Sequence, residues 1–324
     1  MNQSRRKYTQ QSAVALPLLL APSIFSYSSP KSVMEVKIDE INLFLINVTK
    51  ERNFSFGVWK NRQHVMFNIK GANHIGWGET KVASNQPDFD LAEWSKAFKK
   101  LKGMTLGQAI EEVRNQFLSG HWRPIITEGL LMTLYDLMGK IENKPTVKIW
   151  GLEGQDPVPA IFCILEKEEE MVVKQAQIAI DQNMHRYVKI KMFGDFEQDK
   201  KNISALRKFL GPDAFILGDP NRGYKYIKDL KELSKIMIAL HEAGMDGVED
   251  PSSLNKEELI YLQANVGKLS IVPDHIMRPA AKSIEYFDER MGDYFNLHPN
   301  CMGTFAEIND ISKVIRASNK GIMI

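Results

Sequence analysis

Residues 215–221 read Phe-Ile-Leu-Gly-Asp-Pro-Asn, an apolar run that ends on the carboxylate of Asp219. Two further apolar runs end in the same way, at Glu249 in Gly-Val-Glu-Asp-Pro and at Asp274 in Ile-Val-Pro-Asp-His. The three acidic residues follow one another at intervals of 30 and 25 residues. Such an interval matches one strand, one crossover helix and their loops. The pattern therefore predicts parallel strands that each carry a carboxylate at the carboxyl end.

A pair of lysines precedes this series. The run Tyr187-Val-Lys-Ile-Lys191 ends 28 residues before Asp219, and Lys189 and Lys191 alternate by two, so both point to one face of a strand. Taken alone, two such lysines are more often an exposed, solvated pair. Their place one repeat before the carboxylates favours a functional interpretation, in which an amine base faces a metal site.

The C-terminal part of the chain alternates strand and helix patterns. Expected strands are 160–165, 187–191, 214–219, 247–250, 269–274, 294–298 and 321–324, separated by helices such as 167–182, 196–210 and 227–243. Steps of this length favour an α/β fold of the (β/α) TIM-barrel type over a doubly wound sheet. Because the last expected strand ends at Ile324, we expect a barrel that is incomplete after about the seventh strand.

The preceding part has a different organisation. Residues 33–75 alternate as antiparallel strands do, interrupted by a mixed, turn-prone loop over 49–61. The apolar spacing becomes helical over 91–142. This order of strands and then helices is typical of an α+β domain.

Residues 1–30 differ from both parts. Arg5-Arg6 precede an apolar stretch over 13–25 and a small-residue exit, which is typical of an export signal. Paired arginines suggest the twin-arginine route and therefore a periplasmic protein. The alternative is a disordered leader on a cytoplasmic protein. The apolar stretch is too short to predict a membrane span.

The composition excludes several classes of protein. The chain has 324 residues, 44% of them hydrophobic and 25% charged, which is ordinary for a globular protein, with a net charge of +2. Basic residues do not cluster with aromatic ones, so nucleic-acid binding is not expected. Two cysteines exclude a disulfide scaffold and a cysteine-rich zinc site. Assembly into a homo-oligomer is left open.

Three carboxylates gathered at one rim repel one another and resist full ionisation unless a cation lies between them. Oxygen ligands on a rigid rim suit Mg²⁺, with Mn²⁺ as the alternative ion. Such a cation draws charge from a substrate carboxylate, which removal of the proton α to that carboxylate requires. Lys191, nearer the strand end, is then expected to be the base, and Lys189 its electrostatic helper.

In combination, four short motifs resemble the enolase superfamily, specifically its muconate-lactonizing and mandelate-racemase branches. They are Lys189-Ile-Lys191, Asp219-Pro-Asn221, Val248-Glu-Asp-Pro251 and Pro273-Asp274. The preceding half resembles that family's capping domain through Gly76-Trp-Gly-Glu79 and residues 128–140. The resemblance covers roughly residues 35–324. It implies a capping domain over 33–155 and a barrel catalytic domain over 157–324.

The resemblance also implies roles for individual residues. Metal ligands would be Asp219, Glu249 and Asp274, the base would be Lys191, and the neighbours that shape the site would be Asn221 and Asp250. Residues 49–61 and the segment after Gly78 would be lids that select the substrate.

One strand departs from the family pattern. Where relatives of the muconate-lactonizing type carry a lysine, the expected sixth strand reads Phe295-Asn-Leu-His298-Pro. His298 would replace that lysine as acid or base on the opposite face of the substrate, since a neutral imidazole suits proton transfer near neutral pH. The alternative is a buried histidine that is hydrogen bonded to backbone.

The sequence thus predicts a Mg²⁺-dependent racemase or epimerase that acts on a small carboxylate, such as an amino acid or a dipeptide-like molecule. A lyase of the same superfamily, either a sugar-acid dehydratase or a dehydrating synthase, is the second hypothesis. The third is a noncatalytic or broken relative, because the expected barrel lacks an eighth strand.

Overall fold

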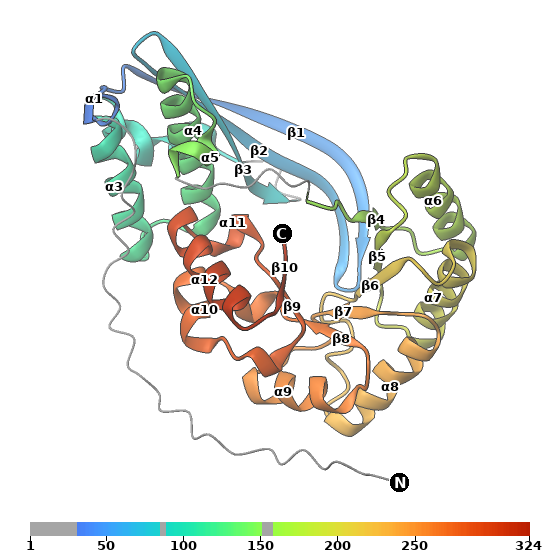
Figure 1. Ribbon diagram of the computed structural model, residues 1–324. Coiled ribbons are helices and arrows are strands. Elements are labelled where there is room, and N and C mark those ends of the chain that lie inside the picture. Colours follow the sequence, from blue (N-terminus) through green and yellow to red (C-terminus); the bar gives the residue numbers. More distant parts are fainter. Residues whose placement is uncertain (1–30, 85–88, 151–157) are drawn as a thin grey trace, which may run out of the picture.

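The computed structural model describes residues 31–84, 89–150 and 158–324 (Figure 1). The expected export signal over residues 1–30 lies outside these ranges, as does the expected domain boundary at 155–157. In the described part of the chain, no helix is both long enough and apolar enough to cross a membrane.

The N-terminal half is an antiparallel sheet covered by helices. Its sheet has the order β1-β2-β3, formed by β1 (Glu40–Phe54), β2 (Gly57–Gly71) and β3 (His74–Ser84). Its helices are α1 (Lys31–Met34), α2 (Leu91–Ser95), the 3₁₀ helix η1 (Lys96–Leu101), α3 (Leu106–Leu118), α4 (Pro124–Glu142) and α5 (Thr146–Ile149). The expected α+β order of strands followed by helices is confirmed.

The sheet packs on α4 through two glycines of β3. A Cβ at Gly76 would overlap the carbonyl oxygen of Thr133, and one at Gly78 would overlap the Thr133 hydroxyl. Behind this contact lies an apolar core that includes the fully buried Phe67, Phe98 and Leu134. The close approach of strand and helix holds the long β1–β2 hairpin in a fixed direction.

The predicted loop over 49–61 is wrong, because this segment is the end of a hairpin. The strands β1 and β2 continue through it and leave only Ser55 and Phe56 in the turn. The register shifts between Thr49 and Arg52, and this irregularity breaks the alternation by which a strand is recognised in sequence. Likewise, the described part of the second expected lid, residues 79–84, belongs to strand β3.

The C-terminal half consists of parallel strands alternating with helices. Five strands pair in the order β4 (Phe162–Ile164), β5 (Tyr187–Lys191), β6 (Phe215–Asp219), β7 (Gly247–Glu249) and β8 (Ser270–Val272). Two more, β9 (Tyr294–Asn296) and β10 (Gly321–Met323), pair in parallel. The amide of Asn296 donates to the Pro273 carbonyl at 2.9 Å, which joins β8 to β9.

Helices connect these strands and cover their outer face (Figure 1). They are α6 (Glu169–Asp181), α7 (Phe196–Leu210), α8 (Leu230–Glu242), α9 (Lys256–Asn265), η2 (His275–Met277), α10 (Ala280–Tyr286), η3 (Glu289–Met291), α11 (Pro299–Met302) and α12 (Phe305–Ala317). All seven expected strand positions are confirmed, and all but β5 are shorter than the apolar runs indicated. This part of the chain is a TIM-type (β/α) unit.

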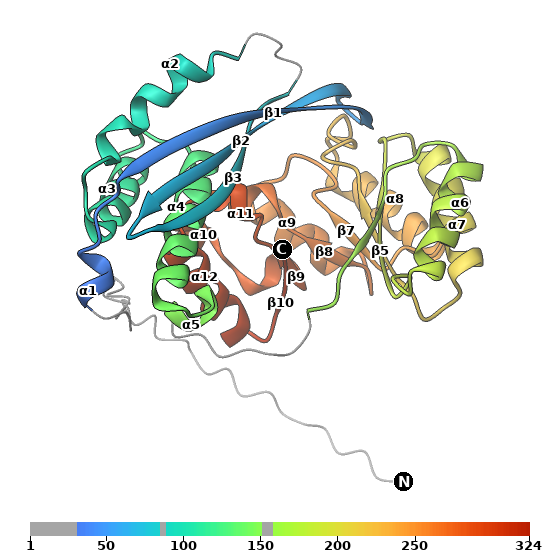
Figure 2. The same ribbon diagram turned by 90° about the horizontal axis from the view of Figure 1, so that it is seen from above.

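The hairpin of β1 and β2 reaches from the first half onto the strand ends of the second (Figures 1 and 2). At its tip, the hydroxyl of Ser55 donates a hydrogen bond of 2.8 Å to the Pro220 carbonyl, directly after β6. The tip is therefore tied to the loop that follows Asp219.

Candidate active site

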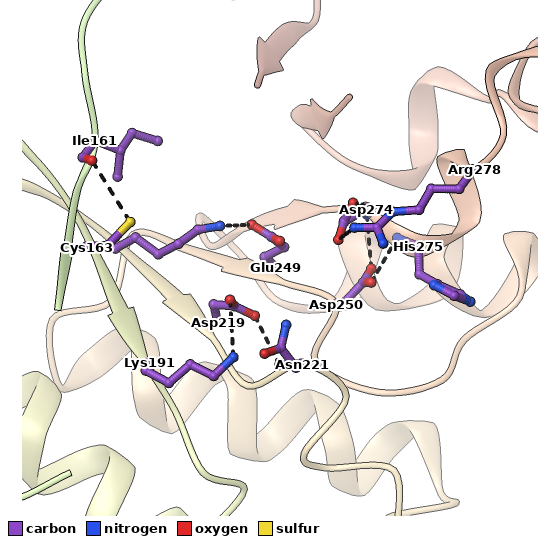
Figure 3. A network of polar contacts seen from close by, with 11 residues as sticks. Ile161, Cys163, Lys191, Asp219, Asn221, Glu249, Asp250, Asp274, His275 and Arg278 are labelled. Carbon is purple, nitrogen blue, oxygen red and sulfur yellow. Dashed lines mark hydrogen bonds and ion pairs between the residues drawn. The ribbon is translucent and has the colours of Figure 1, made fainter. Parts of the chain in front are cut away.

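The residues predicted from spacing meet at the carboxyl ends of β5 to β8 (Figure 3). Lys189 and Lys191 lie on β5, Asp219 ends β6, Glu249 ends β7, and Asp274 follows β8 by two residues. In register, Lys191 pairs with Asp219. Parallel pairing alone thus brings together residues that are distant in sequence.

Each of the three carboxylates contacts a basic side chain. The Lys191 Nζ lies 3.4 Å from Asp219 Oδ2, and the Lys189 Nζ lies 2.6 Å from Glu249 Oε2. Asp274 accepts two hydrogen bonds from Arg278, one of them from Nε at 3.0 Å (Figure 3). The charges of the acidic cluster are therefore balanced one by one.

The two lysines have different electrostatic surroundings. Burial opposes the charge of Lys189, but Glu249 and Asp219 outweigh this effect and raise its pKa. Burial lowers the pKa of Lys191, and Asp219 compensates only in part. Lys191 is thus the lysine that loses its proton more easily, as a base must, while Lys189 stays a cation.

Burial also governs the acids. It raises the pKa of Glu249 to about 7, against the effect of Lys189 and with the help of Asp219 and Asp274. The pKa of Asp250 is raised to about 6, first by burial and then by Asp274. A nearby cation would favour the ionised forms of Glu249 and Asp250 and so oppose these increases.

The two predicted neighbours hold the ends of the strands. The Asn221 backbone amide donates to Asp219 Oδ1 at 3.0 Å. Asp250 accepts from the backbone amides of Asp274 and His275 at 3.0 and 2.9 Å. Both residues have positive φ, 44° for Asn221 and 42° for Asp250, which turns the chain sharply after the strand.

Whether the three carboxylates could hold a divalent cation depends on their arrangement and on their chemistry. Within residues 31–84, 89–150 and 158–324, no group of three or more His, Cys, Asp or Glu side chains is arranged to hold a metal ion. The donor chemistry nevertheless fits one. Glu249 Oε2 is buried and accepts no hydrogen bond of good geometry, although the Lys189 amine is close to it. All three carboxylates line one cavity. These three oxygen donors would hold a hard cation such as Mg²⁺.

The cavity at the strand ends has a volume of about 560 Å³ and is shared by both halves of the chain. His298 lines it as the residue before α11, two positions beyond β9. The ring of Phe54, near the hairpin tip, lies 4.9 Å from the Lys191 Nζ. His275 lines the cavity too, but its imidazole points away from Asp219 and Glu249 (Figure 3).

The two cysteines also line the cavity, and burial raises the pKa of each thiol. A raised pKa disfavours the thiolate, which is the form in which a cysteine acts as a nucleophile.

Several cavity residues were not anticipated from sequence. Arg278 is one, and its signal was its spacing of four from Asp274, which a single helical turn such as η2 brings into contact. The others come from the sheet of the N-terminal half: Arg52, Trp59, Arg62 and Lys81. No local pattern marks these, because only the docking of the N-terminal sheet carries them to the barrel.

Comparison with known proteins identifies the same fold. Residues 171–324 match the family model described as enolase C-terminal domain-like. Muconate cycloisomerase 1 of Acinetobacter baylyi is 20% identical over 255 residues, which are 75% of this chain and 67% of that protein. The L-Lys-D/L-Arg epimerase of Methylococcus capsulatus is 29% identical over 128 residues, 40% of this chain and 34% of the relative.

Solved structures align over most of the chain. The muconate lactonizing enzyme from Pseudomonas fluorescens, complexed with muconolactone, has a TM-score of 0.74 and 19% identity, covering 89% of this chain and 80% of its own. The dipeptide epimerase from Enterococcus faecalis, complexed with Mg and the dipeptide L-Leu-L-Tyr, has a TM-score of 0.73 and 20% identity, covering 89% and 82%.

Proposed function

We propose that this chain, a member of the enolase superfamily of the muconate-lactonizing and mandelate-racemase type, is a metal-dependent racemase or epimerase. Its substrate would be a small carboxylate, such as an amino-acid or dipeptide-like molecule. The observation that carries the proposal is the meeting of Lys191 with the carboxylates of β6, β7 and β8 around one cavity.

Asp219, Glu249 and Asp274 would hold Mg²⁺ in this proposal. The ion, when bound, would neutralise the substrate carboxylate and spread the charge that develops as the α-proton leaves. Homologous structures that are complexed with Mg support this assignment.

Lys191 would accept the α-proton on one face of the substrate. Its lowered pKa favours the neutral amine, and Phe54 shields that amine from water at the hairpin tip. Lys189 would stay charged and stabilise the enediolate through its positive field. His298 would return a proton to the other face, since it enters the cavity from the β9 side.

The test is hydrogen exchange in D₂O. A candidate carboxylate with a stereogenic α-carbon is incubated with the protein and Mg²⁺, and the α-proton signal is followed together with the ratio of stereoisomers. Loss of the signal with appearance of the second isomer supports a racemase or epimerase. Net consumption of substrate with a keto or alkene product would instead assign a lyase of the same superfamily.

A further inference from the structure

Three basic side chains of the N-terminal sheet enter the cavity beside Lys191. They are Arg52 of β1, Arg62 of β2 and Lys81 of β3. Two of them meet at Trp59, whose ring centroid lies 5.0 Å from the Arg62 Cζ and 4.7 Å from the Lys81 Nζ. This cationic wall is formed by three neighbouring strands and therefore has a stable shape.

The cationic wall has no counter-anion among the residues that the structure describes. None of Arg52, Arg62 and Lys81 forms an ion pair there, and the Nε of Arg62 is buried without a hydrogen-bond partner. By contrast, three of the four cations that the barrel contributes, Lys189, Lys191 and Arg278, each contact a carboxylate. Arg52, Arg62 and Lys81 are half-buried, and a cation partly removed from water without a partner is costly, so the arrangement is suited to a ligand that supplies an anion.

The balance of charges around the cavity also favours an anionic ligand. Seven Arg and Lys side chains line it, but only four Asp and Glu side chains do. Burial lowers the pKa of Lys81, with Arg62 as the next cause, and burial with Arg52 lowers the pKa of Arg62. The cations of the wall thus repel one another, and a divalent ion at the strand ends would increase the excess of positive charge.

Aromatic rings connect the wall to the base. The ring centroids of Phe54 and Trp59 are 4.6 Å apart, and Phe54 contacts Lys191 while Trp59 contacts Lys81. A ligand whose reacting carbon lies at Lys191 would therefore extend along these rings towards the wall. A cavity of this volume admits a ligand of that length.

We propose that the substrate carries a second carboxylate, which binds the cationic wall of Arg52, Arg62 and Lys81 while the first carboxylate binds at the strand ends. This proposal rests on the proposed function and names its substrate class, a dicarboxylate. A substrate with a free amino or guanidino group at its distal end would meet three positive charges and bind poorly.

Calorimetric titration tests the proposal directly. The probes are the straight-chain dicarboxylates from succinate to suberate and the half-amide of each, titrated into the full chain with Mg²⁺. At the best chain length, the dicarboxylate is expected to bind at least about tenfold more tightly than its half-amide, because hydrogen bonds to charged groups are the stronger ones. Equal affinities at every length would overturn the proposal.

Two variants test whether the preference for a second carboxylate comes from the cationic wall. Arg62→Met and Lys81→Met should each remove most of the preference for the dicarboxylate over its half-amide. Lys60→Met is the matched control, because Lys60 lies on the same strand as Arg62 but outside the cavity lining. Circular dichroism melts verify that each variant folds. A preference that survives in both variants would also refute the assignment.

Exchange of the α-protons in D₂O, measured on the same ligands, separates this proposal from the proposed function. If a dicarboxylate binds preferentially but its α-protons do not exchange, the cationic wall is supported as a binding site and the catalytic role is refuted. If the α-protons of a monocarboxylate exchange and no second carboxylate is preferred, the catalytic role is supported and the binding role of the wall is refuted.

Discussion

The amine of Lys191 lies 3.4 Å from Oδ2 of Asp219, although the two residues are 28 positions apart in the chain. Pairing of β5 with β6 places them directly opposite each other. On its other side the amine faces the ring of Phe54 at 4.9 Å. Lys191, held between the proposed metal ligand Asp219 and the ring of Phe54, is therefore positioned by both halves of the molecule.

Replacing this lysine should abolish the chemistry and keep the fold. Lys191→Met is expected to slow α-proton exchange by at least about 100-fold, the usual contribution of a positioned base. Exchange in D₂O, followed by NMR, is the measurement. The control is Lys235→Met on the exposed face of α8, which should exchange at the wild-type rate. Exchange at the wild-type rate in Lys191→Met would show that another group is the base.

The rate of exchange should rise with pH. Lys191 acts as a base only when neutral, and its lowered pKa brings the neutral form to a lower pH than an ordinary lysine allows. The initial exchange rate at saturating Mg²⁺ should therefore increase with pH and level off below the usual pKa of lysine. A rate that decreases as the pH approaches that value would contradict this assignment.

Glu249 should make the stability of the metal-free protein depend on pH. Its pKa is about 7 in the folded state and near 4.5 without the fold, so its protonated form stabilises the native state at low pH. That stabilisation is lost as the pH rises through about 7, and the melting temperature should fall by an amount on the order of 5 °C.

Added Mg²⁺ should offset this loss, because it would favour the ionised form. The rise in melting temperature on adding Mg²⁺ is thus expected to be larger above pH 7 than at about pH 5. Glu249→Gln should remove both effects, whereas Glu257→Gln, on the exposed start of α9, should leave them unchanged. A Mg²⁺ response that is the same at both pH values would count against the role of Glu249.

Arg278 should compete with the metal. Its guanidinium donates two hydrogen bonds to Asp274, a proposed ligand, so the ion must displace it. Arg278→Met is expected to lower the metal-free melting temperature and to bind Mg²⁺ about tenfold more tightly in a calorimetric titration. Arg290→Met is a matched control, since Arg290 donates to Asp288 in the same way at an exposed site outside the cavity. Weaker Mg²⁺ binding in Arg278→Met would show that Arg278 supports the ligand instead.

The tie between hairpin and barrel should affect ligand binding. Ser55→Ala removes the hydrogen bond to the Pro220 carbonyl, which is worth about 1 kcal/mol. We expect KM to rise about fivefold with little change in kcat, because the hairpin tip is held less firmly beside the cavity while Lys191 stays in place. Ser32→Ala, at an exposed position of α1, should have the parameters of the wild type. A loss confined to kcat would mean that the tip positions the base rather than the substrate.

Sequence patterns predicted the barrel strands well because these strands are short, apolar and regularly spaced. Their carboxyl ends share one edge, so Lys189, Lys191, Asp219, Glu249 and Asp274 could be placed together without coordinates. The hairpin over 49–61 was missed because its residues are mixed and its register shifts. Its strands are held by pairing with each other rather than by a buried face, and that leaves no alternation to detect.

The sequence by itself determined the repeat of strand and helix, and with it the lysine pair and the three carboxylates at one rim. Periodicity suffices for this, because chain connectivity and backbone hydrogen bonding fix where successive parallel strands end. Only the tertiary structure decided what those groups face. Docking of the N-terminal sheet brings Phe54, Arg62 and Lys81 to the cavity at Lys191, which is 110 or more residues away in the chain. Such contacts depend on shape and packing between elements, which no local pattern in the chain encodes.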